Sequence, residues 1–284
     1  MNRNAPSEDY SQDENIPGPD PSERRLTVYL SSTGVKAYLK HTLDATAGYA
    51  TLIDANWKCD SNEVLRRIEN CIYDNPQVLD DYECDVIIES DRALWVPSEI
   101  AEDEDAREAV YTSIFPAEAE DIFHDLMTES PESPAVLYTL CPGLPSFLRR
   151  TFPGARISSQ FTPMYRRFAS RLTDETALFA DLREERMDIL VFHGQNLLMG
   201  STHRYADDQD AYYHILNCIR QCGLDEKKCE VYISGLKDVR RTLLNDLRDE
   251  LPYVRNTMLP RIDSPKNMPT PALICATNIR KSRF

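Results

Sequence analysis

The chain has 284 residues, 42% of them hydrophobic, and a formal net charge of −15 at pH 7. A surface this acidic repels nucleic-acid phosphates, so we expect no nucleic-acid partner. No apolar stretch approaches the roughly 18 residues that a membrane helix needs, so we also expect no membrane insertion.

The cysteines and the first residues of the chain both favour a cytoplasmic protein. Eight cysteines are scattered along the sequence, which favours reduced thiols over a disulfide framework. Residues 1–24 are rich in proline, serine and acidic residues and have almost no apolar content. We therefore predict a disordered tail there, without a signal peptide.

Charge is segregated along the chain. Between Glu99 and Glu132, twelve acidic residues are accompanied by a single basic one, Arg107. Between Arg149 and Arg171 there are six arginines and no acidic residue. A run of like charge is often only a solvated face, and a docking surface for a partner of opposite charge is the competing interpretation.

The first half of the chain predicts three strands, a helix and a fourth strand. The three strand candidates are short: Leu26–Ser31, Val35–His41 and Gly48–Ile53. Asp60 or Ser61 can cap the helix, whose apolar positions recur with the 3.6-residue period. The apolar run Cys84–Glu89 then predicts a buried strand.

The acidic middle of the chain predicts a helical insert over residues 97–132, which follows a short extended segment at Ala93–Pro97. One amphipathic helix is expected between Ala106 and Phe115, and a second short helix at Ile122, Phe123 and Leu126. After the insert we expect a buried strand, a helix, a short strand and a helix: 135–141, 142–152, 155–158 and 161–172.

The second half repeats the order of the first. Short polar turns separate three strands, which predicts an antiparallel meander: Thr176–Leu182, Met187–Phe192 and Gln195–Thr202. A helix, a nearly all-apolar strand typical of a parallel sheet, and another helix follow: 207–222, 229–234 and 237–250. One more strand and a short C-terminal helix complete the pattern: Tyr253–Met258 and Pro271–Ala276.

A βββαβ order that occurs twice predicts two α/β subdomains of similar topology with a cleft between them. We expect residues 25–170 to form the first subdomain and residues 171–284 the second, together with the C-terminal tail. This order resembles the architecture of the actin-like, or ribonuclease-H-like, ATPase superfamily.

Four segments make the resemblance more specific: Leu30–Val35, Ala93–Ile100, Asp188–Gln195 and Gly223–Gly235. In these the chain resembles an uncharacterised bacterial domain-of-unknown-function family with an actin-like fold. More distantly, it is similar to the actin-like assembly proteins of type IV pili and type II secretion, in which a small extra subdomain contacts partners. None of the four segments is catalytic, so the resemblance implies a fold rather than an activity.

The resemblance also implies where a nucleotide would bind. An actin-like ATPase needs two Gly-rich hairpins, each opened by an Asp that holds magnesium, and a Gly-Gly turn. Here the first hairpin lacks the Asp, the second has Arg183 where a phosphate needs room, and the turn keeps only Gly235. The candidate ligand-binding residues in these three loops are Ser31, Ser32, Thr33, Gly34, Asp181, Arg183, Ser234 and Gly235.

Other chemistry has less support. One set of residues has the spacing of soft metal ligands on a helix and the following strand: His214, Cys218, Cys222 and Cys229. Cys222 falls within the apolar arc of that helix, so we interpret the cysteines as core residues and predict no metal. The sequence contains no G-x-S-x-G and no P-loop, so it gives no support to a hydrolase or a P-loop ATPase.

These observations predict a non-catalytic, cytoplasmic interaction or scaffold protein on a degenerate actin-like fold, without a cofactor. We expect a protein partner or self-association, through Glu102, Asp103, Glu104 and Asp105 and the arginines Arg149 and Arg150. The alternative is a switch that binds a nucleotide or another phosphate ligand through atypical loops. In that case Arg149, Arg150 and Arg156 would supply direct ion pairs to the phosphates.

Overall fold

The structure, a computed structural model, describes residues 24–41, 48–116, 121–128, 130, 132–172, 175–235, 237–259, 265 and 268–277. Most of the predicted tail lies outside these ranges, but Arg24 already belongs to the first strand. None of the helices in the described ranges combines the length and the apolar character that a membrane span requires.

The first subdomain is built on a five-stranded sheet in the order β3-β2-β1-β4-β8. Its strands are β1 (Arg24–Ser31), β2 (Gly34–His41), β3 (Tyr49–Asn56), β4 (Glu83–Ile88) and β8 (Arg156–Ser159). β1 pairs antiparallel with β2 and parallel with β4, as expected for a meander followed by a crossover. The crossover contains α1 (Val64–Tyr73) between two short 3₁₀ turns, Ser61–Glu63 and Pro76–Val78. Helix α1 buries Val64, Ile68 and Ile72 at a spacing of four residues, which confirms the predicted amphipathic helix.

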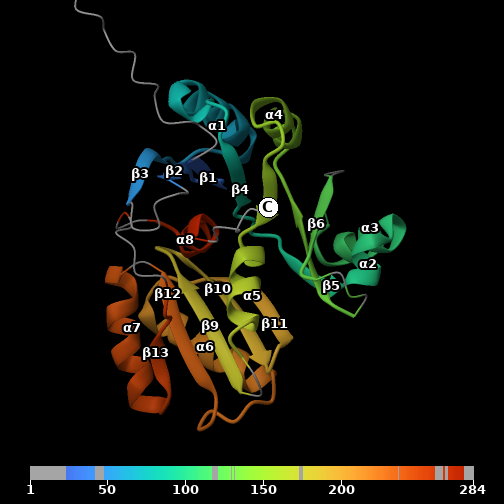
Figure 1. The fold of residues 1–284 in the computed structure, drawn as a ribbon. Helices are drawn as coiled ribbons and strands as arrows, with labels where there is room; N and C mark the ends of the chain where they lie inside the picture. The colour runs from blue at the N-terminus through green and yellow to red at the C-terminus, as the bar shows by residue number, and fades with distance from the viewer. Residues whose placement is uncertain are drawn as a thin grey trace, which may run out of the picture.

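The second subdomain repeats this topology in the sheet β11-β10-β9-β12-β13. Its strands are β9 (Thr176–Leu182), β10 (Arg186–His193), β11 (Asn196–Arg204), β12 (Glu230–Gly235) and β13 (Val254–Asn256). Helices α6 (Asp208–Gln221) and α7 (Lys237–Glu250) make the crossovers. The predicted doubled βββαβα order is therefore present, and Figure 1 shows the two sheets as separate bodies one above the other.

The acidic insert stands beside the first sheet and is part helix, part sheet (Figure 1). It contains β5 (Leu94–Pro97), α2 (Ser98–Glu102), α3 (Glu104–Ile114), β6 (Ile122–Leu126) and β7 (Pro134–Thr139), with strand order β5-β7-β6. The prediction of a second short helix at residues 122–126 was wrong, because this run pairs antiparallel with β7. A short apolar run does not distinguish a helix from a strand, and here the neighbouring strand decides. The insert is also longer than predicted, because the buried strand β7 belongs to it.

Three helices connect these parts. α4 (Leu144–Thr151) leads from the insert to β8, and α5 (Phe161–Ala169) leads toward the second sheet. The C-terminal helix α8 (Thr270–Thr277) lies between the two sheets, where it packs against α5, β1 and β4 (Figure 1). We propose that the boundary between the subdomains falls near residue 171, between α5 and β9.

Candidate functional site

A cavity of about 580 Å³ lies between the two subdomains. The β1–β2 hairpin, the β9–β10 hairpin, the end of β12 and the residues that precede α8 line it, together with residues 56–58, Glu89 and Arg204. Both hairpins come from the first two strands of a sheet, so the repeated topology brings them face to face. Seven of the eight predicted ligand-binding residues line this cavity, and the eighth, Ser234, hydrogen-bonds one of them.

The β1–β2 hairpin supplies hydroxyl groups but no carboxylate. The Ser31 hydroxyl accepts a 3.3 Å hydrogen bond from the Thr33 amide and lies 3.3 Å from the Thr33 hydroxyl. Gly34 is required because a Cβ at this position would collide with the carbonyl oxygen of Ala55 on β3. Trp57 closes the hairpin from outside, its indole N–H donating to the Ser32 carbonyl at 3.0 Å.

The β9–β10 hairpin directs Arg183 across the cleft. The Arg183 amide donates to the Arg186 carbonyl at 2.8 Å, which forms the turn. The Arg183 guanidinium pairs with Asp188 of its own subdomain and with Glu89 of the other, and it donates to the Tyr29 hydroxyl at 2.7 Å. The Arg183 side chain is 13% exposed, Glu89 9% and Asp188 0%, so this ion pair is shielded from water.

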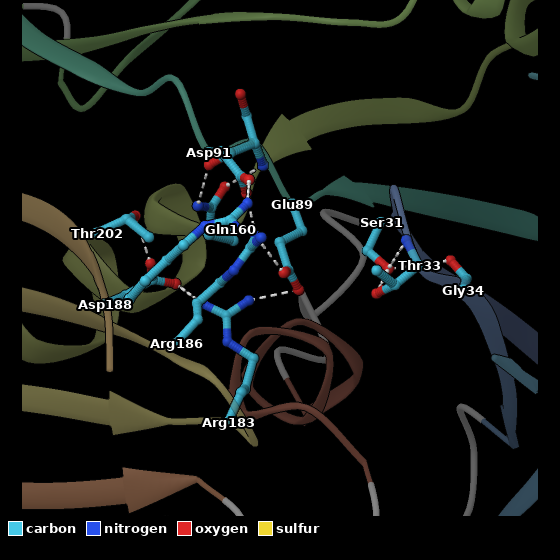
Figure 2. A network of polar contacts seen from close by, with 12 residues as sticks. Ser31, Thr33, Gly34, Glu89, Asp91, Gln160, Arg183, Arg186, Asp188 and Thr202 are labelled. Carbon is cyan, nitrogen blue, oxygen red and sulfur yellow. Dashed lines mark hydrogen bonds and ion pairs between the residues drawn. The ribbon is translucent and has the colours of Figure 1, made fainter. Parts of the chain in front are cut away.

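Two further arginines extend the cluster, and Figure 2 shows one of them, Arg186, directed at Glu89 and Asp91. Arg186 lies 2.7 Å from Glu89 and also pairs with Asp91. Arg204, at the end of β11, lies 2.8 Å from Asp91 and is 76% exposed. Both carboxylates come from the segment that follows β4, and all three arginines come from the second subdomain. The ion pairs Arg183–Glu89, Arg186–Glu89, Arg186–Asp91 and Arg204–Asp91 therefore join the two subdomains, and we call them the cleft ion pairs.

The charge states in the cluster follow from burial and from the neighbouring charges. Burial favours the neutral form of Glu89, but Arg183 and Arg186 outweigh it, and the pKa of Glu89 lies below its ordinary value. Burial raises the pKa of Asp188 to about 6 despite the adjacent Arg183. Burial also opposes the charge on Arg183, yet Asp188 and Glu89 hold its pKa well above the usual value. All three groups are therefore charged at neutral pH.

The turn after β12 brings Asp181, Ser234 and Gly235 together. The Ser234 hydroxyl donates to one carboxylate oxygen of Asp181 at 2.8 Å. The second oxygen has no hydrogen-bond partner among the described residues, and burial raises the pKa of Asp181. Gly235 has φ +101°, and a Cβ there would collide with the backbone of Leu182. Leu236, which stands where the second glycine of the turn would be, lies outside the described residues.

The residues predicted to bind a partner are not brought together. Glu102 to Asp105 are exposed on α2 and α3, and the Asp103 carboxylate caps α3 by accepting from the Ala106 amide. Arg149 and Arg150 are exposed on α4, where Arg150 lies 3.8 Å from Glu69 of α1.

Arg156 is also remote from the cleft. It pairs with Glu83 and Asp85 near the start of β4, whereas Glu89 follows the opposite end of that strand. None of Arg149, Arg150 and Arg156 lines the cavity. The idea that these arginines would hold a phosphate in the cleft is therefore wrong for the observed arrangement.

The cysteines of the possible metal motif are core residues or near-core residues. Cys218 and Cys229 are each 1% exposed and belong to the core of the second subdomain, and Cys222 packs against it. His214 stacks on His203 with 4.5 Å between ring centroids. Within the part of the chain that the structure describes, no three His, Cys, Asp or Glu side chains are arranged to hold a metal ion.

The sequence did not indicate the residues that matter most in the cleft: Tyr29, Glu89, Asp91, Arg186 and Arg204. One signal was present, because Glu89 and Asp91 follow a buried parallel strand, and functional groups often gather at the carboxyl ends of such strands. Their partners lie 97 and 113 residues further along the chain, beyond the range of any local pattern.

Comparisons with known proteins agree with this geometry. The family described as "Protein of unknown function (DUF3822)" matches residues 20–256. A Bacteroides thetaiotaomicron protein with an actin-like ATPase fold and unknown function is 19% identical with a TM-score of 0.74, over 90% of this chain and 96% of that one. These matches confirm the predicted actin-like fold.

Two more distant structures belong to bacterial assembly systems. A chain of the PilM–PilN type IV pilus biogenesis complex is 13% identical with a TM-score of 0.50, over 91% of this chain and 98% of that one. The cytoplasmic domain of EpsL from the Vibrio cholerae type II secretion system is 13% identical with a TM-score of 0.45, over 92% and 96%. No curated protein matches the chain at a significant level.

Proposed function

We propose that this chain is a non-catalytic module for protein interaction. The chain belongs to the family described as "Protein of unknown function (DUF3822)" and has an actin-like ATPase fold. One observation supports this proposal above the others. The buried guanidinium of Arg183 connects Asp188 to Glu89 across the cleft, where the two hairpins approach each other. The protein's own side chains thus join the two subdomains.

The residues at the cleft do not fit a magnesium-bound triphosphate. The first hairpin offers hydroxyls in place of a carboxylate, although Mg²⁺ is usually held by one or two carboxylates together with the phosphates. Asp181 is 1% exposed and already hydrogen-bonded to Ser234. A triphosphate would also have to separate Arg183 from Glu89, which leaves a buried carboxylate without its partner.

The interaction role is supported by the acidic insert. Glu102, Asp103, Glu104 and Asp105 are exposed. The neighbouring Arg107 donates to the Ala101 carbonyl at 2.6 Å, and Arg150 and Arg156 pair with acidic residues outside the insert. A basic partner surface would therefore find these four acidic side chains accessible. The chain of similar fold in the PilM–PilN structure is part of a protein complex. Its support for a protein-binding role here is an analogy at the level of the fold.

The catalytic part of the proposal is tested by a thermal-shift screen of the purified protein with ATP and ADP, with and without magnesium. We expect no shift, because binding would have to break the cleft ion pairs, and no release of phosphate from ATP. Magnesium-dependent ATP turnover that is lost in Asp181→Asn would overturn the proposal.

The interaction part is tested by removing the four charges: Glu102→Gln, Asp103→Asn, Glu104→Gln and Asp105→Asn. Asn at position 103 still caps α3, so folding should be preserved. A matched control removes four exposed acidic charges elsewhere: Asp80→Asn, Asp81→Asn, Asp249→Asn and Glu250→Gln. We expect partner capture and its salt dependence to fall only in the first variant. Equal capture by both variants contradicts a docking role for the insert.

The cavity favours one second candidate, a switch that binds a phosphate ligand without hydrolysis. The exposed cationic side chains Lys58 and Arg204 line the 580 Å³ cavity and leave room for a small anion beside the ion pairs. The same thermal-shift screen distinguishes this candidate, because stabilisation by inorganic phosphate or pyrophosphate without magnesium would support it.

A further inference from the structure

The segment Glu89–Arg92 touches three parts of the molecule within four residues. It follows β4 of the first sheet and leads into β5 of the insert. Its two carboxylates, Glu89 and Asp91, make the cleft ion pairs. Figure 2 shows both side chains directed toward the arginines of the second subdomain, with Gln160 beside them.

Helix α5 holds the same segment through a buried amide. The Ser90 amide donates to the Gln160 side-chain oxygen at 3.2 Å, and the Gln160 side-chain nitrogen donates to the Ser90 carbonyl at 3.0 Å. The backbone N–H of Gln160 donates to the Ile88 carbonyl at 2.9 Å. Gln160 is 0% exposed, so these bonds are not exchanged with water. The backbone at Ser90 is therefore fixed to the N-terminus of α5.

The insert holds the end of the segment through Tyr111. This tyrosine lies on α3, is 0% exposed, and donates from its hydroxyl to the Arg92 carbonyl at 2.7 Å. The Ser90 hydroxyl accepts from the Arg92 amide at 3.2 Å and closes the turn between the two. A shift of Asp91 toward or away from the arginines therefore moves the hydrogen-bond acceptor of α3.

A second contact joins the insert to the second subdomain. Trp95 of β5 lies over Gly200 of β11, where a Cβ would collide with the indole ring. The Trp95 ring also contacts Phe161 and Tyr165 of α5, with centroids 5.6 and 6.0 Å away. The insert thus packs on an edge strand of the second subdomain as well as on helix α5 of the first.

From these contacts we infer that Glu89–Arg92 couples the cleft to the insert, so that the cleft ion pairs set the position of α3 and β5. The inference rests on the proposed function, because α2 and α3 bear the acidic residues offered to a partner. Coupling between two sites is reciprocal. A partner that moves α3 therefore changes the closure of the cleft by the same linkage.

The two tryptophans of the chain make a direct test possible, since one lies at each end of this path: Trp57 at the cleft and Trp95 at the insert. In a Trp57→Phe background, Trp95 alone reports on the insert. Glu89→Gln and Asp91→Asn weaken the cleft ion pairs. The control is Glu83→Gln, on the same strand, because its partner Arg156 belongs to the same subdomain.

We expect Glu89→Gln and Asp91→Asn to shift the Trp95 emission and to speed hydrogen exchange at least tenfold in Glu104–Ile114 and Leu94–Pro97. The control should leave both unchanged. In the reverse direction, Tyr111→Phe removes the hydroxyl that donates to the Arg92 carbonyl and also lies 3.3 Å from the Thr139 hydroxyl of the insert. This variant should speed exchange in the β9–β10 hairpin.

The inference is wrong if the cleft variants change exchange in the hairpin but not in α3 and β5. It is equally wrong if Tyr111→Phe affects the insert alone. Should Glu89→Gln fail to fold, Asp91→Asn gives the same comparison, because Asp91 is 38% exposed and tolerates a neutral side chain better. ATP turnover by the unchanged protein would contradict the proposed function without altering these exchange measurements, so the two failures are distinguishable.

Discussion

Substitution of Arg183 by methionine tests whether the cleft ion pairs hold the two subdomains together. Glu89 would keep Arg186 at 2.7 Å, but Asp188 would keep only the Thr202 hydroxyl at 2.6 Å. Asp188 is 0% exposed, so the substitution leaves one buried carboxylate without a counter-ion. Removing one partner of a buried pair costs about 3–5 kcal/mol of unfolding free energy. The melting temperature should fall by on the order of 10 °C.

The assay is urea unfolding, followed as a change in midpoint at constant slope. Arg183→Met combined with Asp188→Asn should recover about half of the loss or more, because Asn is uncharged and still accepts from Thr202. Arg255→Met is the matched control, since Arg255 is 58% exposed and lies 3.4 Å from Glu230. This control should change stability by less than about 1 kcal/mol.

The pH dependence gives an independent check on the same variant. The folded-state pKa of Asp188 is raised above its unfolded value, so its stabilising contribution is present at low pH and is lost as pH rises through the folded pKa of about 6. Without Arg183 the folded pKa rises further. Arg183→Met should therefore be less destabilising at pH 5 than at pH 8. A loss below about 1 kcal/mol at both pH values would refute the reasoning, because it would mean that water already screens the pair.

Three further predictions concern single positions. Gly200→Leu should cost about 1–3 kcal/mol by overpacking against Trp95, and the double variant with Trp95→Ala should recover part of it in a double-mutant cycle. Burial lowers the pKa of His203 to about 4, so the unfolded chain binds its proton first as pH falls. Stability should decline from pH 6.5 toward pH 4 by roughly 1–2 kcal/mol after solvent screening, and His203→Phe should remove this decline in urea midpoints. Asp125→Leu should cost about 3 kcal/mol in thermal unfolding, because it leaves the Ser159 amide and two hydroxyls without their buried acceptor.

The fold could be predicted from the sequence because each element has a clear period and the order of elements repeats. The apolar positions of α1, at Val64, Ile68 and Ile72, can be recognised from the sequence without any tertiary information. The β6 strand could not be predicted in the same way. Its residues Ile122–Leu126 are partly buried along their whole length, and their conformation depends on pairing with β7.

The candidate site could be located but not described. Strand ends in a known topology brought Ser31, Asp181 and Gly235 to one cavity. The direction of a long side chain depends instead on which charge it meets. Arg183 was expected to block a phosphate. No local pattern indicates that it reaches Glu89, because charged residues pair across sequence separations that such patterns do not cover.

The distribution of exposure along the cleft ion pairs has a consequence for how the cleft could open. The outer pair, Arg204–Asp91, is 76% and 38% exposed, so it contributes at most about 1 kcal/mol and weakens with salt. The inner pair, Arg183–Glu89, is 13% and 9% exposed and is screened far less. Opening that begins at the outer pair admits water to Asp91 and Arg186 before Arg183 is reached. Each step rehydrates the next carboxylate, and hydration lowers the cost of separating it. Apolar contacts also cross between the subdomains: Trp95 lies over Gly200 of β11, and Phe168 of α5 stacks on Phe179 of β9 with 4.1 Å between ring centroids. The ion pairs and these apolar contacts therefore both oppose opening of the cleft.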